Sequence, residues 1–472
     1  MTLSSDLFLF VFLPVVFVLF WSLRTKAQRH VLLALAGYLF YASWDWRYCA
    51  LLLYTSLLNF GAGLAIQRST TDRARRSWLT LAIASDLILL GFFKYYNFFS
   101  HSLSTAVPGL ALPLLHLALP LGISFYTFTT ISYVLEVSSG RIEANTSLWA
   151  HLAYVNFFPK VIAGPITRFH QLRDDLEHLD DPPREEWLAR GVGFLIVGLM
   201  KKVMIADHIG RGIDPLLASY ATMSAGQAWT AAVGYATQLY FDFSGYSDMA
   251  VGLGCLFGLR LPQNFNRPYL SPSLTEMWRR WHISLNSWLF DYIYLPLTTG
   301  GGFLRGRFRT VLMIVFLASG LWHGAGWTFI LWGAVQGVGM VVHYQWGEFY
   351  RSLCRRDRSW VQVRKGRPYL TASWALTQSF FLVTLVLFRS VNLPMAASWL
   401  RTMFAGPWSR FPLGGLGLGW IAAALLWIAL VPETWDFRFS TQRRWALAYA
   451  VAFVAMYFFM NGTDTVFLYR QF

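Results

Sequence analysis

A histidine lies in a long stretch of the chain that carries no charge. His323 stands in GLWHGAGW (320–327), inside the uncharged run 310–347. Neutral imidazole is the natural general base near neutral pH, and the flanking glycines let another molecule approach the backbone closely. The alternative is a core histidine that only donates to a backbone carbonyl. The setting favours His323 as a base, with Trp322 beside it as a supporting residue.

A second histidine lies in WRRWHISLN (278–286). Read as one continuous helix, this segment places Arg279, His282 and Asn286 on one face, at spacings of three and four residues. An interfacial amphipathic helix, with Trp and Arg at the level of the lipid headgroups, is the alternative. That alternative does not explain the histidine. We therefore expect Arg279 and Asn286 to support a binding or catalytic His282.

Two carboxylates lie six residues apart in the apolar segment YFDFSGYSDMA (240–250). Asp242 and Asp248 could form ion pairs with Arg279 or Arg280, or they could orient a histidine. A purely structural pairing is the alternative to a catalytic role.

Several familiar signatures are missing from the sequence. It has no P-loop, no G-x-G-x-x-G, no nucleophile elbow and no histidine–carboxylate spacing typical of metal ligands, so we expect no metal. His170 and Asp175 do fit an H-x4-D spacing. We attribute that two-residue match to chance, because the chain has 10 histidines and the match lies in a charged loop.

The composition indicates what holds these residues in place. Of 472 residues, 56% are hydrophobic and only 13% are charged, against about 25% charged in soluble proteins. A soluble or disordered chain is excluded, and we expect an all-α polytopic membrane protein. A spanning helix needs about 20 apolar residues, and the uncharged runs predict ten to twelve such helices. The net charge of +15 is scattered over short loops, which indicates lipid headgroups and not nucleic acid as the partner.

The chain is expected to form a single membrane domain over 1–472, in three parts. N-terminal helices occupy 1–150, a core with the chemistry occupies 151–345, and a basic loop with C-terminal helices occupies 346–472. The middle part mixes short apolar pieces with Pro, Gly and charge. Irregular backbone at membrane depth is tolerated only where it is buried or lines a wet cavity. We therefore expect re-entrant or interfacial helices around a cavity there, and we expect the basic loops at 305–309 and 348–367 to face the cytoplasm.

Several long motifs resemble one family of membrane enzymes. They are FDFSGYSDMA (241–250), NFNRPYLSPSLTEMWRRWHISLNSWLFDYIYLPL (264–297), GLWHGAGWTFILWG (320–333), FPKVIAGPITRF (158–169), LGISFYTFTTISYVLEV (121–137) and the closing FLYRQF (467–472). They look like the membrane-bound O-acyltransferase (MBOAT) family. More narrowly, they resemble its bacterial polysaccharide branch, typified by the membrane subunit of alginate O-acetylation. The teichoic-acid D-alanyl transferase is a more distant relative.

The resemblance implies a ring of helices around a central tunnel. It aligns the family's invariant histidine with His323 and a second histidine with His282. The chain departs from the family at one position, because Gln336 stands where many relatives carry a histidine in W-G-x-x-H-G. Glutamine cannot act as a base, but it could bind substrate or orient His323.

The function that we expect from the resemblance is O-acyl transfer, most plainly O-acetylation of an exported polysaccharide such as alginate or cellulose. His323 would act as general base, and His282 would bind the donor or stabilise an oxyanion. No cofactor would be bound permanently; the donor would be acetyl-CoA or an acyl-carrier thioester reached from the cytoplasm. Expected partners are periplasmic esterase-like subunits, an acyl carrier protein and membrane lipid, at the bacterial inner membrane.

Two alternatives remain open from the sequence. The acyl group could be D-alanine, delivered by a carrier protein to a cell-envelope polymer. The chain could also be a transporter that moves a polar substrate past the same histidines, although the lack of inverted repeats counts against a transporter.

Overall fold

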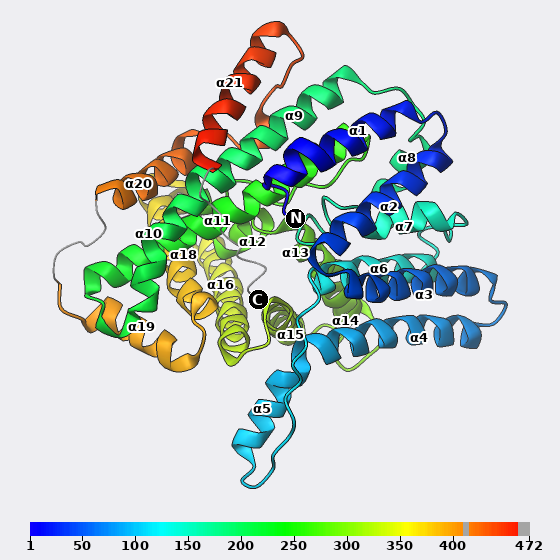
Figure 1. Cartoon of the computed structure of the whole chain (residues 1–472). Coiled ribbons are helices and arrows are strands. Elements are labelled where there is room, and N and C mark those ends of the chain that lie inside the picture. Colours follow the sequence, from blue (N-terminus) through cyan, green and yellow to red (C-terminus); the bar gives the residue numbers. More distant parts are fainter. Residues whose placement is uncertain (409–414, 461–472) are drawn as a thin grey trace. The chain divides into compact units, whose positions relative to one another are not determined.

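A computed structural model describes residues 1–408 and 415–460 of the chain. This part of the chain folds into helices and contains no β-strand, which confirms the all-α prediction (Figure 1). The closing motif FLYRQF (467–472) lies outside the described residues, as do parts of 411–432 and 445–463, two of the uncharged runs from which spanning helices are expected.

The described chain forms two compact units. Unit 1 comprises Met1–Leu199, Gly245–Pro262 and Arg438–Phe458, and unit 2 comprises Met200–Ser244, Gln263–Phe437 and the described end of the chain. The long helix α11 (Ala225–Leu256) contributes its first part to unit 2 and its last part to unit 1.

Unit 1 carries the N-terminal helices. These are α1 (Leu13–Ser22), α2 (Lys26–Asp45), α3 (Cys49–Arg68), α4 (Asp72–Leu90), α5 (Tyr96–Ala106), α6 (Ile123–Ser138), α7 (Leu148–Asn156), α8 (Phe169–Glu177), α9 (Glu185–Leu199) and, near the C-terminus, α21 (Arg443–Met460). Buried polar side chains join three of them. Asp86 Oδ2 on α4 accepts hydrogen bonds from Asn59 Nδ2 on α3 (2.9 Å) and from Thr130 Oγ1 on α6 (2.7 Å).

Unit 2 carries the helices of the predicted core and those that follow it. They are α10 (Asp207–Ala218), α12 (Leu274–Arg280), α13 (Ile283–Leu289), α14 (Leu295–Thr299), α15 (Phe308–His323), α16 (Trp327–Arg356), α17 (Ser359–Lys365), α18 (Arg367–Arg389), α19 (Leu393–Ala405) and α20 (Gly415–Leu430). A π-helical segment, Met200–Ala206, leads into α10. The short helices α12, α13 and α14 fall where the sequence predicted pieces too short to span a membrane.

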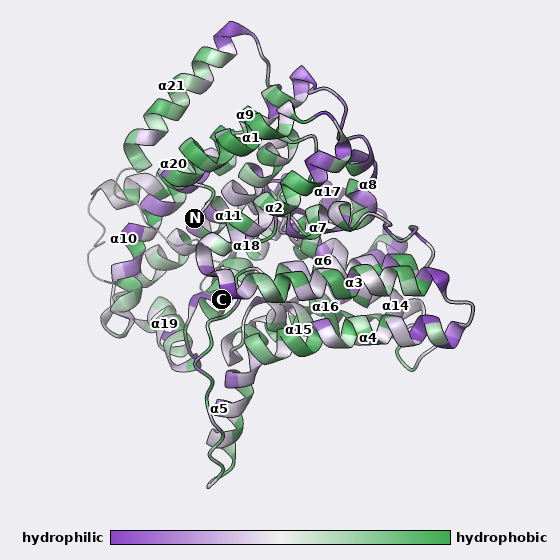
Figure 2. Cartoon of the chain, turned by 45° about the vertical axis from the view of Figure 1, so that its right-hand side comes forward, coloured by the Kyte–Doolittle hydropathy of each residue, from purple (hydrophilic) through white to green (hydrophobic). Residues whose placement is uncertain are grey.

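Within residues 1–408 and 415–460, three helical segments are long and apolar enough to cross a membrane. They are Lys26–Arg68, Asp72–Ala106 and Arg367–Arg389, and the shorter apolar helices are Leu7–Ser22, Phe308–His323 and Gly417–Leu430. Figure 2 shows α3 and α4 hydrophobic or near neutral along most of their length and hydrophilic at the end that joins them. The count of ten to twelve spanning helices stays a prediction.

The basic segment 348–367 is helical, and the prediction of a loop there is wrong. Helix α16 continues to Arg356, and α17 begins three residues later at Ser359. The two helices pack through Tyr350, which is buried and donates a hydrogen bond to the carbonyl of Trp360 (2.8 Å). Helix α16 therefore extends nine residues beyond the uncharged run, which ends at residue 347.

Candidate active site

The α15–α16 hairpin places His323. A Cβ atom on Gly320 would collide with the carbonyl oxygen of Phe329, and one on Gly333 would collide with that of Phe316. The two helices can lie this close only because glycine has no side chain at these points. His323 is the last residue of α15, so this contact sets its position relative to α16.

Aromatic rings surround His323, which is buried. The ring centroids of Trp322, Trp332 and Phe388 lie 4.9, 5.3 and 5.0 Å from the centroid of its imidazole. The Trp332 ring stands at 89° to the imidazole and the Phe388 ring at 73°. These rings come from α15, α16 and α18, so three helices together enclose the predicted base.

His282 lies at a break between two helices, and the prediction of one continuous helix there is wrong. Helix α12 ends at Arg280 and α13 begins at Ile283, with His282 between them at φ 46°, ψ 53°. A positive φ is uncommon for a residue other than glycine. The face shared by Arg279, His282 and Asn286 therefore does not exist.

Contacts distant in sequence produce this break. Asn264 lies on a preceding loop; its backbone carbonyl accepts a hydrogen bond from the Ile283 N–H (2.9 Å) and its side chain contacts His282. Asn286 Nδ2 donates to the carbonyls of Trp278 (2.8 Å) and Trp281 (2.5 Å). Asn286 thus satisfies carbonyls that the interrupted helix would otherwise leave unpaired.

The structure brings the two predicted histidines together. Their ring centroids are 6.5 Å apart, and the ring of Trp322 lies 5.7 Å from that of His282. Both imidazoles are buried in unit 2. At this separation one carbonyl or hydroxyl group of a bound substrate could contact both rings, so the pair can carry acid–base chemistry.

Arg279 is not brought to the histidines. Its side chain is exposed, whereas His282 is buried. The neighbouring Arg280 pairs with Glu276 one turn earlier on α12, at 2.5 Å. Arg280 therefore pairs within α12, at a partly exposed position.

Gln336 joins two of the helices that enclose His323. It is fully buried, and its Nε2 donates to Thr384 Oγ1 at 2.7 Å, which links α16 to α18. Gln336 lies four residues after Trp332, and Thr384 lies four residues before Phe388. The link is therefore about one turn from the two rings that pack on His323. Gln336 Oε1 has no hydrogen-bond partner in the structure.

Asp242 pairs with a lysine that the sequence interpretation missed. Lys202 Nζ lies 2.6 Å from Asp242 Oδ1 and 2.7 Å from Asp207 Oδ1, and all three side chains are buried. The sequence does hint at a buried ion pair here, because two adjacent lysines stand in the apolar stretch FLIVGLMKKVMIA (194–206). Asp248 is also buried, but it belongs to unit 1.

The adjacent Lys201 forms a second buried ion pair. Its Nζ lies 3.1 Å from Glu433 Oε1. Glu433 Oε2 accepts further hydrogen bonds from the Arg267 N–H (3.0 Å) and the Tyr240 hydroxyl (3.2 Å). Glu433 thus ties the π-helical segment, α11 and the loop before α12 to one carboxylate.

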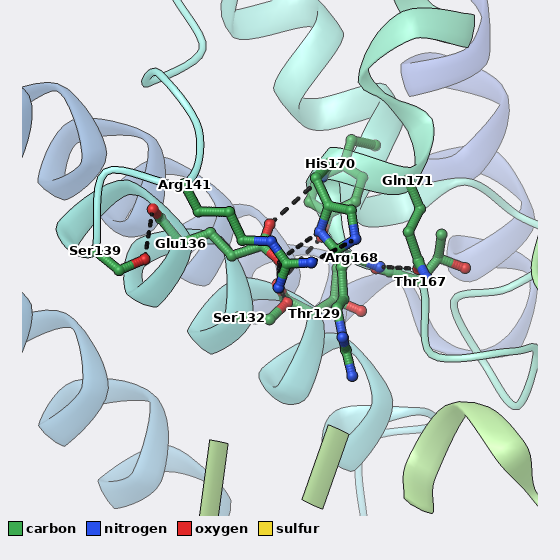
Figure 3. A network of polar contacts seen from close by, with 10 residues as sticks. Thr129, Ser132, Glu136, Ser139, Arg141, Thr167, Arg168, His170 and Gln171 are labelled. Atoms are coloured by element: carbon green, nitrogen blue, oxygen red, sulfur yellow. Dashed lines mark hydrogen bonds and ion pairs between the residues drawn. The ribbon is translucent and has the colours of Figure 1, made fainter. Parts of the chain in front are cut away.

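A separate polar cluster lies in unit 1 (Figure 3). The buried Glu136 on α6 contacts His170 Nδ1 on α8 at 2.5 Å, and Arg141 Nη1 lies 3.8 Å from the same carboxylate oxygen. Asp175 instead binds Arg260, and this hydrogen-bonded carboxylate raises the pKa of the Arg260 guanidinium. His170 and Asp175, which fit the H-x4-D spacing, therefore contact different residues. Within the described residues, no three His, Cys, Asp or Glu side chains converge as metal ligands would.

Comparison with known proteins identifies the family of proteins to which the chain belongs. The profile of the membrane-bound O-acyltransferase family matches residues 80–363, which include His282 and His323. The chain belongs to this family and is a membrane protein.

Individual relatives cover most of the chain. The chain is 38% identical to the probable alginate O-acetylase AlgI of Pseudomonas aeruginosa, over 91% of its own length and 81% of that protein. It is 39% identical to the probable alginate O-acetylase AlgI of Azotobacter vinelandii, over 91% and 84%. It is 34% identical to the peptidoglycan O-acetyltransferase of Helicobacter pylori, over 85% and 79%.

Proposed function

We propose that this O-acyltransferase transfers acetyl groups from a cytoplasmic thioester for the modification of an exported polysaccharide of the alginate or cellulose type. The observation that carries the proposal is the buried pair His282–His323, with ring centroids 6.5 Å apart, inside the segment that matches the family. The acetylases among the relatives support acetyl as the acyl group.

His323 is the general base of the proposed reaction. Its imidazole takes the proton of an acceptor hydroxyl, whose oxygen attacks the thioester carbonyl. The carbon–sulfur bond then breaks, and the thiol leaves with a proton. General-base assistance is typically worth about 10²–10⁴-fold in rate. The rings of Trp322, Trp332 and Phe388 surround the buried imidazole and hold its orientation.

Donor, partners and location follow from the same proposal. The donor is acetyl-CoA or an acyl-carrier thioester, used as a substrate and not as a bound cofactor. The basic segment 348–367 supplies positive charge suited to the phosphates of such a donor. Periplasmic esterase-like subunits pass the acetyl group to the polymer, and the protein resides in the bacterial inner membrane.

Reconstituted protein tests the proposal. Purified wild type in lipid nanodiscs is supplied with radiolabelled acetyl-CoA or acetylated carrier protein, and release or transfer of the label is followed. We expect His323→Gln to lower the rate by about 10²-fold or more. His343→Gln is the matched control, because His343 lies on the neighbouring helix α16, two turns beyond Gln336, and it should retain wild-type activity.

The acetyl content of the exported polymer completes the test. In a host that depends on this protein, His323→Gln should abolish polymer O-acetylation while the protein level in the membrane is unchanged. Normal acetylation in that variant would remove His323 from the reaction. D-alanine on the polymer, or acetyl groups confined to peptidoglycan, would overturn the proposed acyl group or acceptor.

A further inference from the structure

Asn264 contacts the unusual backbone at His282 through both its side chain and its own backbone. Asn264 is buried, and its Oδ1 accepts hydrogen bonds from His282 Nδ1 (3.0 Å), the Ser284 N–H (3.2 Å) and Ser284 Oγ (2.9 Å). Its backbone carbonyl accepts the Ile283 N–H (2.9 Å). Residues at positive φ persist only where surrounding structure over-determines them, and such residues cluster at functional sites.

These contacts determine which ring nitrogen carries the proton. A backbone N–H can only donate, so the atom of Asn264 that receives the Ser284 N–H is the amide oxygen. An amide oxygen can only accept, so His282 Nδ1 carries the hydrogen. In the neutral ring, Nε2 then bears the lone pair. The ring of Phe243, 4.6 Å away and perpendicular to the imidazole, fixes the plane in which that lone pair lies.

We propose that Asn264 is a positioning residue that fixes the tautomer of His282, so that His282 enters the acyl transfer as a hydrogen-bond acceptor for a substrate O–H or S–H group. This inference rests on the proposed function. It differs from a role in oxyanion stabilisation, which would require a second proton on Nε2. His323, whose ring centroid lies 6.5 Å from that of His282, acts on the same substrate as base.

Substitutions at Asn264 test the proposal through activity and its pH profile. Asn264→Leu leaves the Nδ1–H without its acceptor and should lower kcat/KM by about tenfold or more. Asn264→Asp places a carboxylate beside Nδ1–H, which favours the protonated ring. The acidic limb of kcat/KM should therefore move to higher pH by about one unit or more. Asn266→Leu is the matched control, because Asn266 lies two residues along the same loop and is exposed.

The outcomes separate positioning from a merely structural role. A structural role would lower the amount of folded protein in both Asn264 variants without moving the acidic limb. Wild-type activity in Asn264→Leu would overturn the proposal, and so would a pH titration of the His282 ring, followed by its ¹⁵N shifts, that is unchanged in folded Asn264→Asp. If Asn264→Leu fails to fold, that titration in Asn264→Asp still decides the question.

A spectroscopic measurement tests the tautomer without any activity. In protein labelled with ¹⁵N-histidine, the signals of His282 are assigned by their loss in His282→Gln. We expect Nδ1 protonated and Nε2 unprotonated in wild type, and a mixture of tautomers in Asn264→Leu. A proton on Nε2 in wild type would refute the inference. If no thioester serves as donor, the proposed function fails while this measurement still stands.

Discussion

Lys202→Met removes the positive charge between two buried carboxylates. Lys202 Nζ lies 2.7 Å from Asp207 and 2.6 Å from Asp242, and none of the three side chains is more than 7% exposed. Methionine keeps the length of the side chain but cannot compensate either carboxylate. Two like charges then share a buried site, where each is costly without a partner.

Breaking a buried ion pair by removing one partner costs about 3–5 kcal/mol. For a chain of this size, we expect the apparent Tm to fall by roughly 3–10 °C, because 1 kcal/mol moves Tm less in a large protein than in a small one. Thermal unfolding of detergent-solubilised protein, scanned at one fixed rate, measures this change. The deficit should narrow between pH 8 and pH 5, because protonation of one carboxyl removes the repulsion that Lys202→Met creates.

Lys365→Met is the control for the loss of a lysine. Lys365 is exposed at the end of α17, so its replacement should cost at most about 0.5 kcal/mol. If Lys202→Met and Lys365→Met melt at the same temperature at pH 8, the ion triad does not stabilise the fold and the reasoning is refuted.

Two further predictions concern the helices around His323. Gly333→Ala should cost about 1–3 kcal/mol, because its Cβ would collide with the carbonyl of Phe316; Gly301→Ala, with nothing within 4 Å, should be neutral in the same thermal scan. Thr384→Val should cost about 1–3 kcal/mol by leaving the buried Gln336 amide without its acceptor. Adding Gln336→Leu should recover part of that loss. If the destabilisations of the two single substitutions simply add in the double variant, the Gln336–Thr384 hydrogen bond does not contribute to stability.

Local patterns in the sequence were sufficient to predict the helical class of the fold and to single out the two histidines. Uncharged runs predicted the all-α fold, and the glycine-flanked position of His323 in such a run identified it as a candidate. The pairing of His282 with His323 follows from the tertiary fold, and no spacing in the sequence predicts it. The family resemblance, and not their spacing, is what assigned His282 and His323 to one candidate active site.

The failures have a common physical origin in contacts distant along the chain. The helical period through His282 continued in the sequence, but Asn264, 18 residues away, interrupts the helix. The sequence left Arg279, Arg280 or a histidine as possible partners of Asp242, yet Lys202 lies beside it. Side-chain periodicity reports which face of a helix is apolar, and it carries no information on which distant residue satisfies a buried polar group.

The ion pair of Lys201 has a consequence for the synthesis of the protein. Its partner Glu433 is encoded 232 residues later, whereas Asp207 follows Lys202 after only five residues. At about 5–20 residues per second, Glu433 emerges roughly 10–50 s after Lys201. During that interval the nascent chain holds an apolar segment whose ammonium group has not met its carboxylate. This buried ion pair can therefore form only after translation has passed Glu433, whereas the pair between Lys202 and Asp207 can form as soon as the π-helical segment has been made.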